Sequence, residues 1–261
     1  MKREKFIVTS SARRADEALE LAIARRKILV INGAPGLGKT RWVEEQFKGL
    51  EHPLLLRICA HWTERAALAA MVKLLRGFEH YDADRHAVHQ LYKILTRELR
   101  EAPRVIFVDE GDYLVERSRS IRLLHTLRDL FDETGCILVF ISIARLGRTL
   151  STGRGLIEAV ASRVGATVTF TPASAADGQL LADGLIEDCR LSRDLVGHAV
   201  KSCAGVLRSL LTTFEEIERL AHAAKIDRLD LAKWRELQAL TAPSADDLAG
   251  PDESPKLRAV I

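Results

Sequence analysis

The chain has 261 residues, of which 47% are hydrophobic and 29% charged, and its formal net charge at pH 7 is +3. This length allows one large domain, or one large and one small domain. No apolar run reaches the roughly 18 residues that a membrane span needs. The charged start has no apolar stretch of signal-peptide length behind it, so we expect a cytoplasmic protein.

Apolar runs and helical periodicity alternate along the first 170 residues. The predicted strands span residues 27–32, 53–59, 104–109, 136–142 and 167–170, and a shorter extended piece spans residues 6–9. The predicted helices span residues 13–26 (with Ser10 and Ser11 as caps), 41–47, 63–77, 84–101, 118–133 and 155–163. Strands that alternate with helices indicate a parallel sheet covered on both faces, so we expect an α/β nucleotide-binding core over residues 1–172.

The pattern changes after Pro172. No strand is legible there, and three or four helices are expected between about residues 174 and 240. This change predicts a helical subdomain over residues 173–240. Pro, Ser, Asp and Gly dominate from Thr241 onward, so residues 241–261 are expected to form a flexible tail.

The loop after the first predicted strand matches the phosphate-binding pattern G-x-x-x-x-G-K-[ST]. It reads Gly33-Ala34-Pro35-Gly36-Leu37-Gly38-Lys39-Thr40 and has a strand before it and a helix after it, as the motif requires. Glycines let consecutive backbone N–H groups curl around phosphate oxygens, and the helix N-terminus adds positive potential. Lys39 can reach the β- and γ-phosphates and Thr40 can offer its hydroxyl to Mg²⁺, so the sequence predicts a nucleoside triphosphate site.

Two carboxylates end the third predicted strand. Asp109 and Glu110 follow the apolar run Val105–Val108, at the edge of the sheet where the phosphate loop is expected. We expect Asp109 to bind Mg²⁺ through water and Glu110 to polarise the attacking water as a general base. An ordinary strand ending in an acidic turn is the alternative.

Three single residues are weaker candidates. Ser142 ends the fourth predicted strand, where its hydroxyl can position the attacking water, although strand-end serines also form ordinary turns. Arg163 precedes the fifth strand and is expected to reach the nucleotide of a neighbouring subunit. Arg208, in the helical part, is expected to contact the nucleotide of its own subunit. Solvated surface positions are the alternative for both arginines.

Basic residues also follow two of the strands. Trp62 and Arg65 follow the second strand, and Arg117, Arg119 and Arg122 follow the acidic pair. Their charge and their loop or helix-start positions suit contacts to DNA phosphates. The net charge of +3 does not by itself demand a nucleic acid, and ordinary solvated loops are the alternative.

In their order, these motifs resemble the AAA+ ATPases, and more narrowly the phage Mu-type B proteins, which select target DNA in transposition. Residues 127–135, Leu127-Arg128-Asp129-Leu130-Phe131-Asp132-Glu133-Thr134-Gly135, look like the LRD-x-x-D-x-TG stretch of that branch. The segment Val8-Thr9-Ser10-Ser11-Ala12-Arg13-Arg14 is similar to its entry segment. The resemblance covers about residues 6–223.

The resemblance implies a five-stranded αβα core of strand order 5-1-4-3-2, followed by a small all-helical lid. It implies Mg²⁺-dependent ATP hydrolysis, with Ser142 as sensor 1, Arg163 as arginine finger and Arg208 as sensor 2. It also implies ATP-dependent homo-oligomers or helical filaments on double-stranded DNA, which stimulate a transposase in DNA recombination, and a location in the host cytoplasm if a bacteriophage encodes the chain. Mu-type B proteins carry an N-terminal helix-turn-helix domain, whereas this sequence starts almost at the ATPase, so its core loops are expected to bind DNA.

Two other functions remain open from the sequence. A helicase-loader-type AAA+ ATPase would act on a replicative helicase and prefer single-stranded DNA. A switch NTPase without a DNA partner would use its helical part to bind proteins, and DNA would not change its rate of hydrolysis.

Overall fold

The computed structural model describes residues 5–77, 83–116, 118–153 and 157–241. Its elements, in chain order, are α1 (Ser10–Arg25), β1 (Ile28–Asn32), α2 (Lys39–Gly49), β2 (Leu54–Arg57), α3 (Glu64–Arg76), the 3₁₀-helix η1 (Ala83–Arg85), α4 (Val88–Glu101), β3 (Val105–Asp109), the 3₁₀-helix η2 (Gly111–Val115), α5 (Ser118–Thr134), β4 (Ile137–Ile141), α6 (Arg145–Thr152), α7 (Glu158–Ala161), β5 (Val164–Thr169), α8 (Ala175–Leu185), β6 (Arg190–Leu191), α9 (Arg193–Ser202), α10 (Leu207–Ala223), β7 (Arg228–Leu229) and α11 (Leu231–Thr241). Among these described residues, no helix is long and apolar enough to cross a membrane.

The five longer strands form one parallel sheet of order β2-β3-β4-β1-β5, which confirms the expected fold class and strand order. β4 is buried along its whole length and β1 is buried up to Asn32, because helices cover the centre of the sheet on both faces. The edge strand β5 alternates between half-buried and exposed residues. Since the strands are parallel, their carboxyl ends meet at one edge of the sheet.

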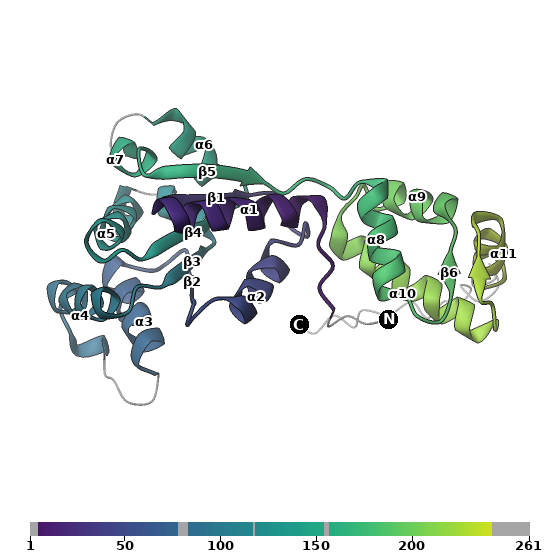
Figure 1. Ribbon diagram of the computed structural model, residues 1–261, viewed down its shortest axis with the longest axis horizontal. Helices are drawn as coiled ribbons and strands as arrows, with labels where there is room; N and C mark the ends of the chain where they lie inside the picture. The colour runs from purple at the N-terminus through teal and green to yellow at the C-terminus, as the bar shows by residue number, and fades with distance from the viewer. Residues whose placement is uncertain (1–4, 78–82, 117, 154–156, 242–261) are drawn as a thin grey trace, which may run out of the picture.

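The helices pack on the sheet through apolar faces. α1 lies over β1 and β5, and α3, α4 and α5 pack together at the end of the molecule farther from α8–α11 (Figure 1). α2 is fixed by Trp42, whose fully buried ring packs edge-on against Phe107 of β3. The cap of α1 is Thr9 and not the expected Ser10 or Ser11. The Thr9 hydroxyl accepts a hydrogen bond from Ala12 N, so the helix begins at Ser10.

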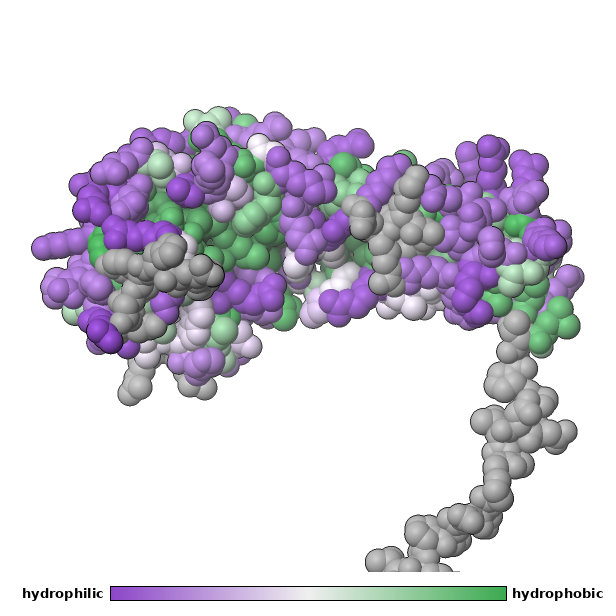
Figure 2. All heavy atoms as spheres, turned by 90° about the horizontal axis from the view of Figure 1, so that it is seen from below, coloured by the Kyte–Doolittle hydropathy of each residue, from purple (hydrophilic) through white to green (hydrophobic). Residues whose placement is uncertain are grey.

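The C-terminal helices have a hydrophobic cluster of their own. It is centred on Leu195, Leu210, Phe214 and Trp234, whereas the cluster around the large sheet runs from Ala12 to Phe170. On this ground we propose a boundary near residue 172 between a core and a helical lid. On the face drawn in Figure 2, hydrophilic side chains cover most of both parts. The predicted tail lies almost wholly outside the described residues.

Several elements differ from the predictions. The extended piece at residues 6–9 forms no strand, and the helix expected over residues 155–163 is the four-residue α7. The structure adds α6, which was not expected because Gly147 interrupts its sequence, and a parallel pair of two-residue strands, β6 and β7. Two residues are too few to show the alternation that marks a strand.

Candidate functional site

The loop between β1 and α2 turns on glycines with positive φ. Gly36 and Gly38 have φ values of +81° and +92°, which L side chains rarely adopt. A Cβ atom on Gly36 would lie 2.9 Å from Val206, and one on Gly38 would lie 2.9 Å from Leu207. The start of α10 therefore rests directly on the loop, and the backbone N–H of Arg208 donates a hydrogen bond to the Gly36 carbonyl at 3.1 Å.

Lys39 begins α2 and folds back over the loop. Its Nζ donates to the carbonyl oxygens of Gly33 at 2.5 Å and Ala34 at 3.0 Å. Burial lowers the pKa of Lys39 below its ordinary value, and the nearby carboxylates of Asp109 and Glu110 act in the opposite direction. The ammonium group thus lies between the loop carbonyls and two acids, where phosphate oxygens can replace the carbonyls as its acceptors.

The acidic pair at the end of β3 lies beside this loop. Asp109 Oδ1 accepts a hydrogen bond from the backbone N–H of Glu110 at 2.9 Å, and Asp109 Oδ2 accepts one from Arg57 Nε at 3.3 Å. Arg57 ends the neighbouring strand in register with Asp109. Glu110 has φ +59°, in the left-handed region, so the chain turns sharply where it leaves β3. The side chain of Glu110 is exposed.

The end of β4 is tied to the end of β1. Ser142 is buried, and its hydroxyl donates to Asn32 Oδ1 at 2.5 Å. Gly147 of α6 packs on the same carboxamide so closely that a Cβ atom there would lie 2.0 Å from Asn32 Nδ2. Asp112 fixes the start of α6. Its carboxylate accepts hydrogen bonds from the backbone N–H groups of Ile143 at 2.8 Å and Leu146 at 2.7 Å.

Most of the phosphate loop, the acidic pair with Arg57, and Ser142 line one cleft of about 670 Å³. The predicted site residues on its wall are Pro35, Gly36, Leu37, Gly38, Lys39, Thr40, Asp109, Glu110, Ser142 and Arg208. At the other end the wall is apolar and includes Phe6 and Ile7 of the N-terminal segment and Leu181, Leu185, Leu207 and Leu211 of the lid. A cleft with a charged end for phosphates and an apolar end for a flat ring suits a nucleotide.

A buried carboxylate joins the N-terminal segment to the lid. Asp177, 3% exposed near the start of α8, accepts hydrogen bonds from Ser10 N at 2.7 Å and Ser10 Oγ at 2.9 Å. It also accepts from Ser174 N at 3.0 Å and Ser174 Oγ at 2.7 Å. Burial alone would raise its pKa, but the hydrogen bonds from Ser10 and Ser174 outweigh burial and hold the pKa of Asp177 below its ordinary value.

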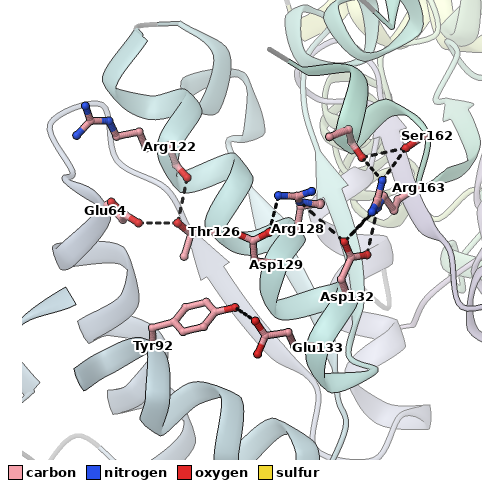
Figure 3. A network of polar contacts seen from close by, with 11 residues as sticks. Glu64, Tyr92, Arg122, Thr126, Arg128, Asp129, Asp132, Glu133, Ser162 and Arg163 are labelled. Carbon is pink, nitrogen blue, oxygen red and sulfur yellow. Dashed lines mark hydrogen bonds and ion pairs between the residues drawn. The ribbon is translucent and has the colours of Figure 1, made fainter. Parts of the chain in front are cut away.

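Arg163 lies away from the cleft of its own chain. Its carbonyl accepts a hydrogen bond from Ile28 N at the start of β1, which is the edge of the sheet opposite the phosphate loop. Its guanidinium pairs with Asp132 of α5 (Figure 3). Arg163 therefore does not line the cleft of its own chain. Its contact with the nucleotide of a neighbouring subunit stays a prediction, with a surface ion pair as the alternative.

The two basic segments lie close to each other. The hydroxyl of Thr126 on α5 donates to Glu64 at the start of α3, at 2.5 Å, and so connects the helices that carry Arg65 and Arg122 (Figure 3). Both arginines are exposed, whereas Trp62 is half-buried against the core. Arg117 lies outside the described residues, and for Arg119 only its backbone position in α5 is described.

Sequence reasoning missed four parts of the site. Arg57, Asn32 and Asp112 each lie at or within three residues of a strand end, which was the available signal. The N-terminal segment that carries Phe6 had no periodicity to mark it as part of the wall. Across the described residues, no group of His, Cys, Asp and Glu side chains has the arrangement of a dedicated metal site.

Residues 23–150 match the family model described as "AAA domain". The structure is similar to Aeropyrum pernix ORC1 in complex with DNA, with 21% identity, a TM-score of 0.58, and coverage of 88% of this chain and 64% of ORC1. It is also similar to Aeropyrum pernix ORC2 in its ADPNP-ADP complexes (15% identity, TM-score 0.63, 92% of this chain and 70% of ORC2). A third similar structure is the Thermotoga maritima RuvB Holliday junction branch migration motor (16% identity, TM-score 0.57, 91% of this chain and 71% of RuvB).

The fold is therefore that of the P-loop AAA+ ATPases. This chain spans less than two thirds of the length of the ORC1 chain. No curated protein matches the chain significantly. The AAA+ part of the resemblance is thus supported, and its narrower part, the Mu-type B branch, belongs to what we propose.

Proposed function

We propose that this chain is an ATP-dependent, sequence-non-specific double-stranded-DNA-binding ATPase. In this proposal it oligomerises on DNA and delivers target DNA to a transposase. The observation that carries the ATPase part is the single cleft in which the phosphate loop, Lys39, Asp109 and Glu110 meet. The same cleft also has apolar side chains on its wall, among them Phe6, Leu181 and Leu207.

The polar residues of the cleft have distinct parts in hydrolysis under this proposal. The loop N–H groups and the ammonium of Lys39 bind the phosphates, and the start of α2 adds positive potential. The donor set fits Mg²⁺, which prefers carboxylate and hydroxyl oxygens and supplies charge neutralisation when bound; Asp109 and Thr40 would hold it. Glu110 orients a water molecule and accepts its proton, and Ser142 accepts a hydrogen bond from the same water.

The DNA part rests on the face formed by the starts of α3 and α5. Arg65 and Arg122 project from helices that one hydrogen bond connects, and contacts to phosphates from this face require no base sequence. The similar ORC1 structure was determined in complex with DNA. The transposase part rests on the resemblance of residues 127–135 to the Mu-type B stretch.

A binding experiment tests the DNA part. Purified protein is titrated onto labelled double-stranded DNA with ATP, with ADP and without nucleotide, at 50 and 200 mM salt. We expect binding to need ATP and to weaken at least about tenfold at the higher salt, because each phosphate contact releases counterions. Lys39→Ala, which loses the phosphate-binding ammonium, is expected to abolish both binding and hydrolysis; a variant that hydrolyses ATP at the normal rate would refute the site.

The same assay separates the other functions. A preference for single-stranded DNA would favour the helicase-loader type. Hydrolysis that DNA leaves unchanged would favour a switch NTPase. A pull-down with the transposase encoded beside this gene, where one exists, tests the last part of the proposal, and stimulation of strand transfer by the wild type but not by Lys39→Ala is the expected result.

A further inference from the structure

Most of the N–H groups of the Arg163 side chain are already used in hydrogen bonds to Asp132 and to the end of α7. Nε donates to Asp132 Oδ1 at 3.1 Å and one Nη2 hydrogen donates to Oδ2 at 2.9 Å (Figure 3). Both Nη1 hydrogens are used as well, by the Ala159 carbonyl and the Ser162 hydroxyl, each at 2.9 Å. Of the five N–H groups of a guanidinium, only one is left for any other molecule.

This paired state is poorly suited to a phosphate on another subunit. Arginine recognises phosphate best through two parallel N–H groups, and a single remaining N–H cannot make that contact. The carboxylate of Asp132 would also lie next to the phosphate oxygens and repel them. Arg163 can therefore bind the phosphates of a neighbouring nucleotide through two N–H groups only when its ion pair with Asp132 is broken.

A second arginine lies on the other side of Asp132. Arg128 Nε is 3.9 Å from Asp132 Oδ2, too far for a hydrogen bond, while an Nη2 hydrogen of Arg128 pairs with Asp129 at 2.5 Å. Within the described parts of the chain, Arg128 Nε is buried and has no hydrogen-bond partner. A buried donor without a partner is costly, so Asp132 gains a favourable contact by turning to Arg128.

We propose that Asp132 is a two-position carboxylate that controls whether Arg163 is available to a neighbouring subunit. Paired with Arg163 it withholds that side chain; turned onto Arg128 Nε it satisfies the buried donor and releases Arg163. The backbone of Arg163 is fixed by its bonds to Ile28 and Val160, so the change is confined to side chains. This inference rests on the proposed role of Arg163 in trans, and makes Asp132 a positioning residue rather than a catalytic one.

A mixing experiment measures how readily Arg163 of one subunit completes the nucleotide site of another. Acceptor subunits carry Arg163→Ala and keep an intact nucleotide site. Donor subunits carry Glu110→Gln, which is expected to keep ATP binding and assembly on DNA but to slow the donor's own hydrolysis, so that they supply Arg163 to the acceptor. Hydrolysis on DNA is measured as donor is titrated into acceptor. Because the donor itself hydrolyses ATP very slowly, the hydrolysis measured comes from acceptor sites that a donor Arg163 has completed.

Adding Asp132→Asn to the donor is expected to lower the donor concentration for half-maximal hydrolysis roughly fivefold, the effect of losing one partly exposed ion pair of about 1 kcal/mol. In the donor subunit, Arg128→Lys keeps the positive charge but removes the Nε–H group that has no hydrogen-bond partner. Asp132 then has less reason to turn away from Arg163, so the donor concentration for half-maximal hydrolysis is expected to rise. Glu133→Gln is the matched control, since Glu133 is the next residue of α5 and pairs with Tyr92 and Arg100 instead.

Three results would overturn parts of this proposal. If Asp132→Asn donors act no better than the parent donors, although their thermal unfolding is unchanged, the two-position carboxylate is wrong. An Arg128→Lys donor that acts as well as its parent would contradict it too, and does not depend on the stability of the Asp132 variant. If parent donors fail to restore any hydrolysis, the trans role of Arg163 is wrong and the proposed assembly fails with it.

Discussion

Replacing Asp177 by Ala tests the joint between the lid and the N-terminal segment. The carboxylate accepts four hydrogen bonds from two serines that begin different helices, Ser10 of α1 and Ser174 before α8. It is nearly inaccessible to solvent. Alanine removes the acceptor of all four hydrogen bonds at once, including those of the two backbone N–H groups, which are partly buried.

The cost can be worked out from the donors that are left. The two serine hydroxyls can rotate toward other acceptors, so we count only the backbone N–H groups of Ser10 and Ser174. A hydrogen bond to a charged group contributes about 1.5 kcal/mol or more, so the free energy of unfolding should fall by about 3 kcal/mol. In a chain of this size that corresponds to a fall in Tm of roughly 6–12 °C.

The assay is thermal unfolding of the wild type, Asp177→Ala and Asp183→Ala. Asp183 lies on the same helix and makes one exposed hydrogen bond, with Gln179, so its replacement should cost no more than about 0.5 kcal/mol. Two variants of equal stability would refute the reasoning.

The pH dependence gives a second check on the same carboxylate. The pKa of Asp177 is lower in the folded protein than in the unfolded chain, where it is about 3.9. Its contribution is therefore complete above that value and is lost as pH falls through the folded pKa. The difference in stability between the wild type and Asp177→Ala should be constant near neutral pH and shrink below about pH 4.

Three further predictions concern the site and the core. Glu110→Gln should retain ATP binding but slow hydrolysis at least about a hundredfold in single-turnover measurements, because the general base is lost. Gly36→Ala should weaken binding of a fluorescent nucleotide, since its φ of +81° is strained for alanine and the new methyl group meets the lid, whereas Gly49→Ala has free space around it and should bind normally. Trp42→Phe removes the Nε1–H donor to Asp16, a bond of 2.7 Å, and should lower the free energy of unfolding in urea by about 1.5 kcal/mol; an unchanged urea midpoint would contradict this.

The sequence predicted the parts of the site that local chemistry determines. A phosphate loop needs its glycines and Lys39 at fixed spacing, and a buried strand that ends in Asp109 can be recognised from its apolar run alone. The strand order came from the family resemblance, because the local pattern of a parallel strand does not say which strand lies beside it. The placement of Asp109 on the same edge as the loop followed from the parallel sheet itself, because the carboxyl ends of parallel strands share one edge.

What the sequence could not provide are contacts between segments far apart in the chain. The bond from Arg208 N to the Gly36 carbonyl depends on how α10 packs on the loop, and the pairing of Ser142 with Asn32 depends on the neighbouring positions of β4 and β1. α6 was missed because glycine has low helix propensity, and the cap that compensates comes from Asp112, more than thirty residues earlier in the chain.

β2 and α5 connect the proposed DNA face to the nucleotide site. β2 leads to Arg57 beside Asp109, and α5 carries Asp132, the partner of Arg163. β2 ends in Arg57, which pairs with Asp109, and the chain leads from there directly into the segment of Trp62. α5 carries Arg122 near its start and Asp132 near its end. Because a helix and a strand of a packed core move as rigid elements, DNA bound at their ends would act on Asp109 through β2 and on the partner of Arg163 through α5. DNA should therefore change the rate of ATP hydrolysis both through Asp109 of one subunit and through Arg163 of its neighbour. In the mixing experiment, Arg57→Ala should reduce the stimulation of hydrolysis by DNA when it is placed in the acceptor subunit, and should have no effect in the donor.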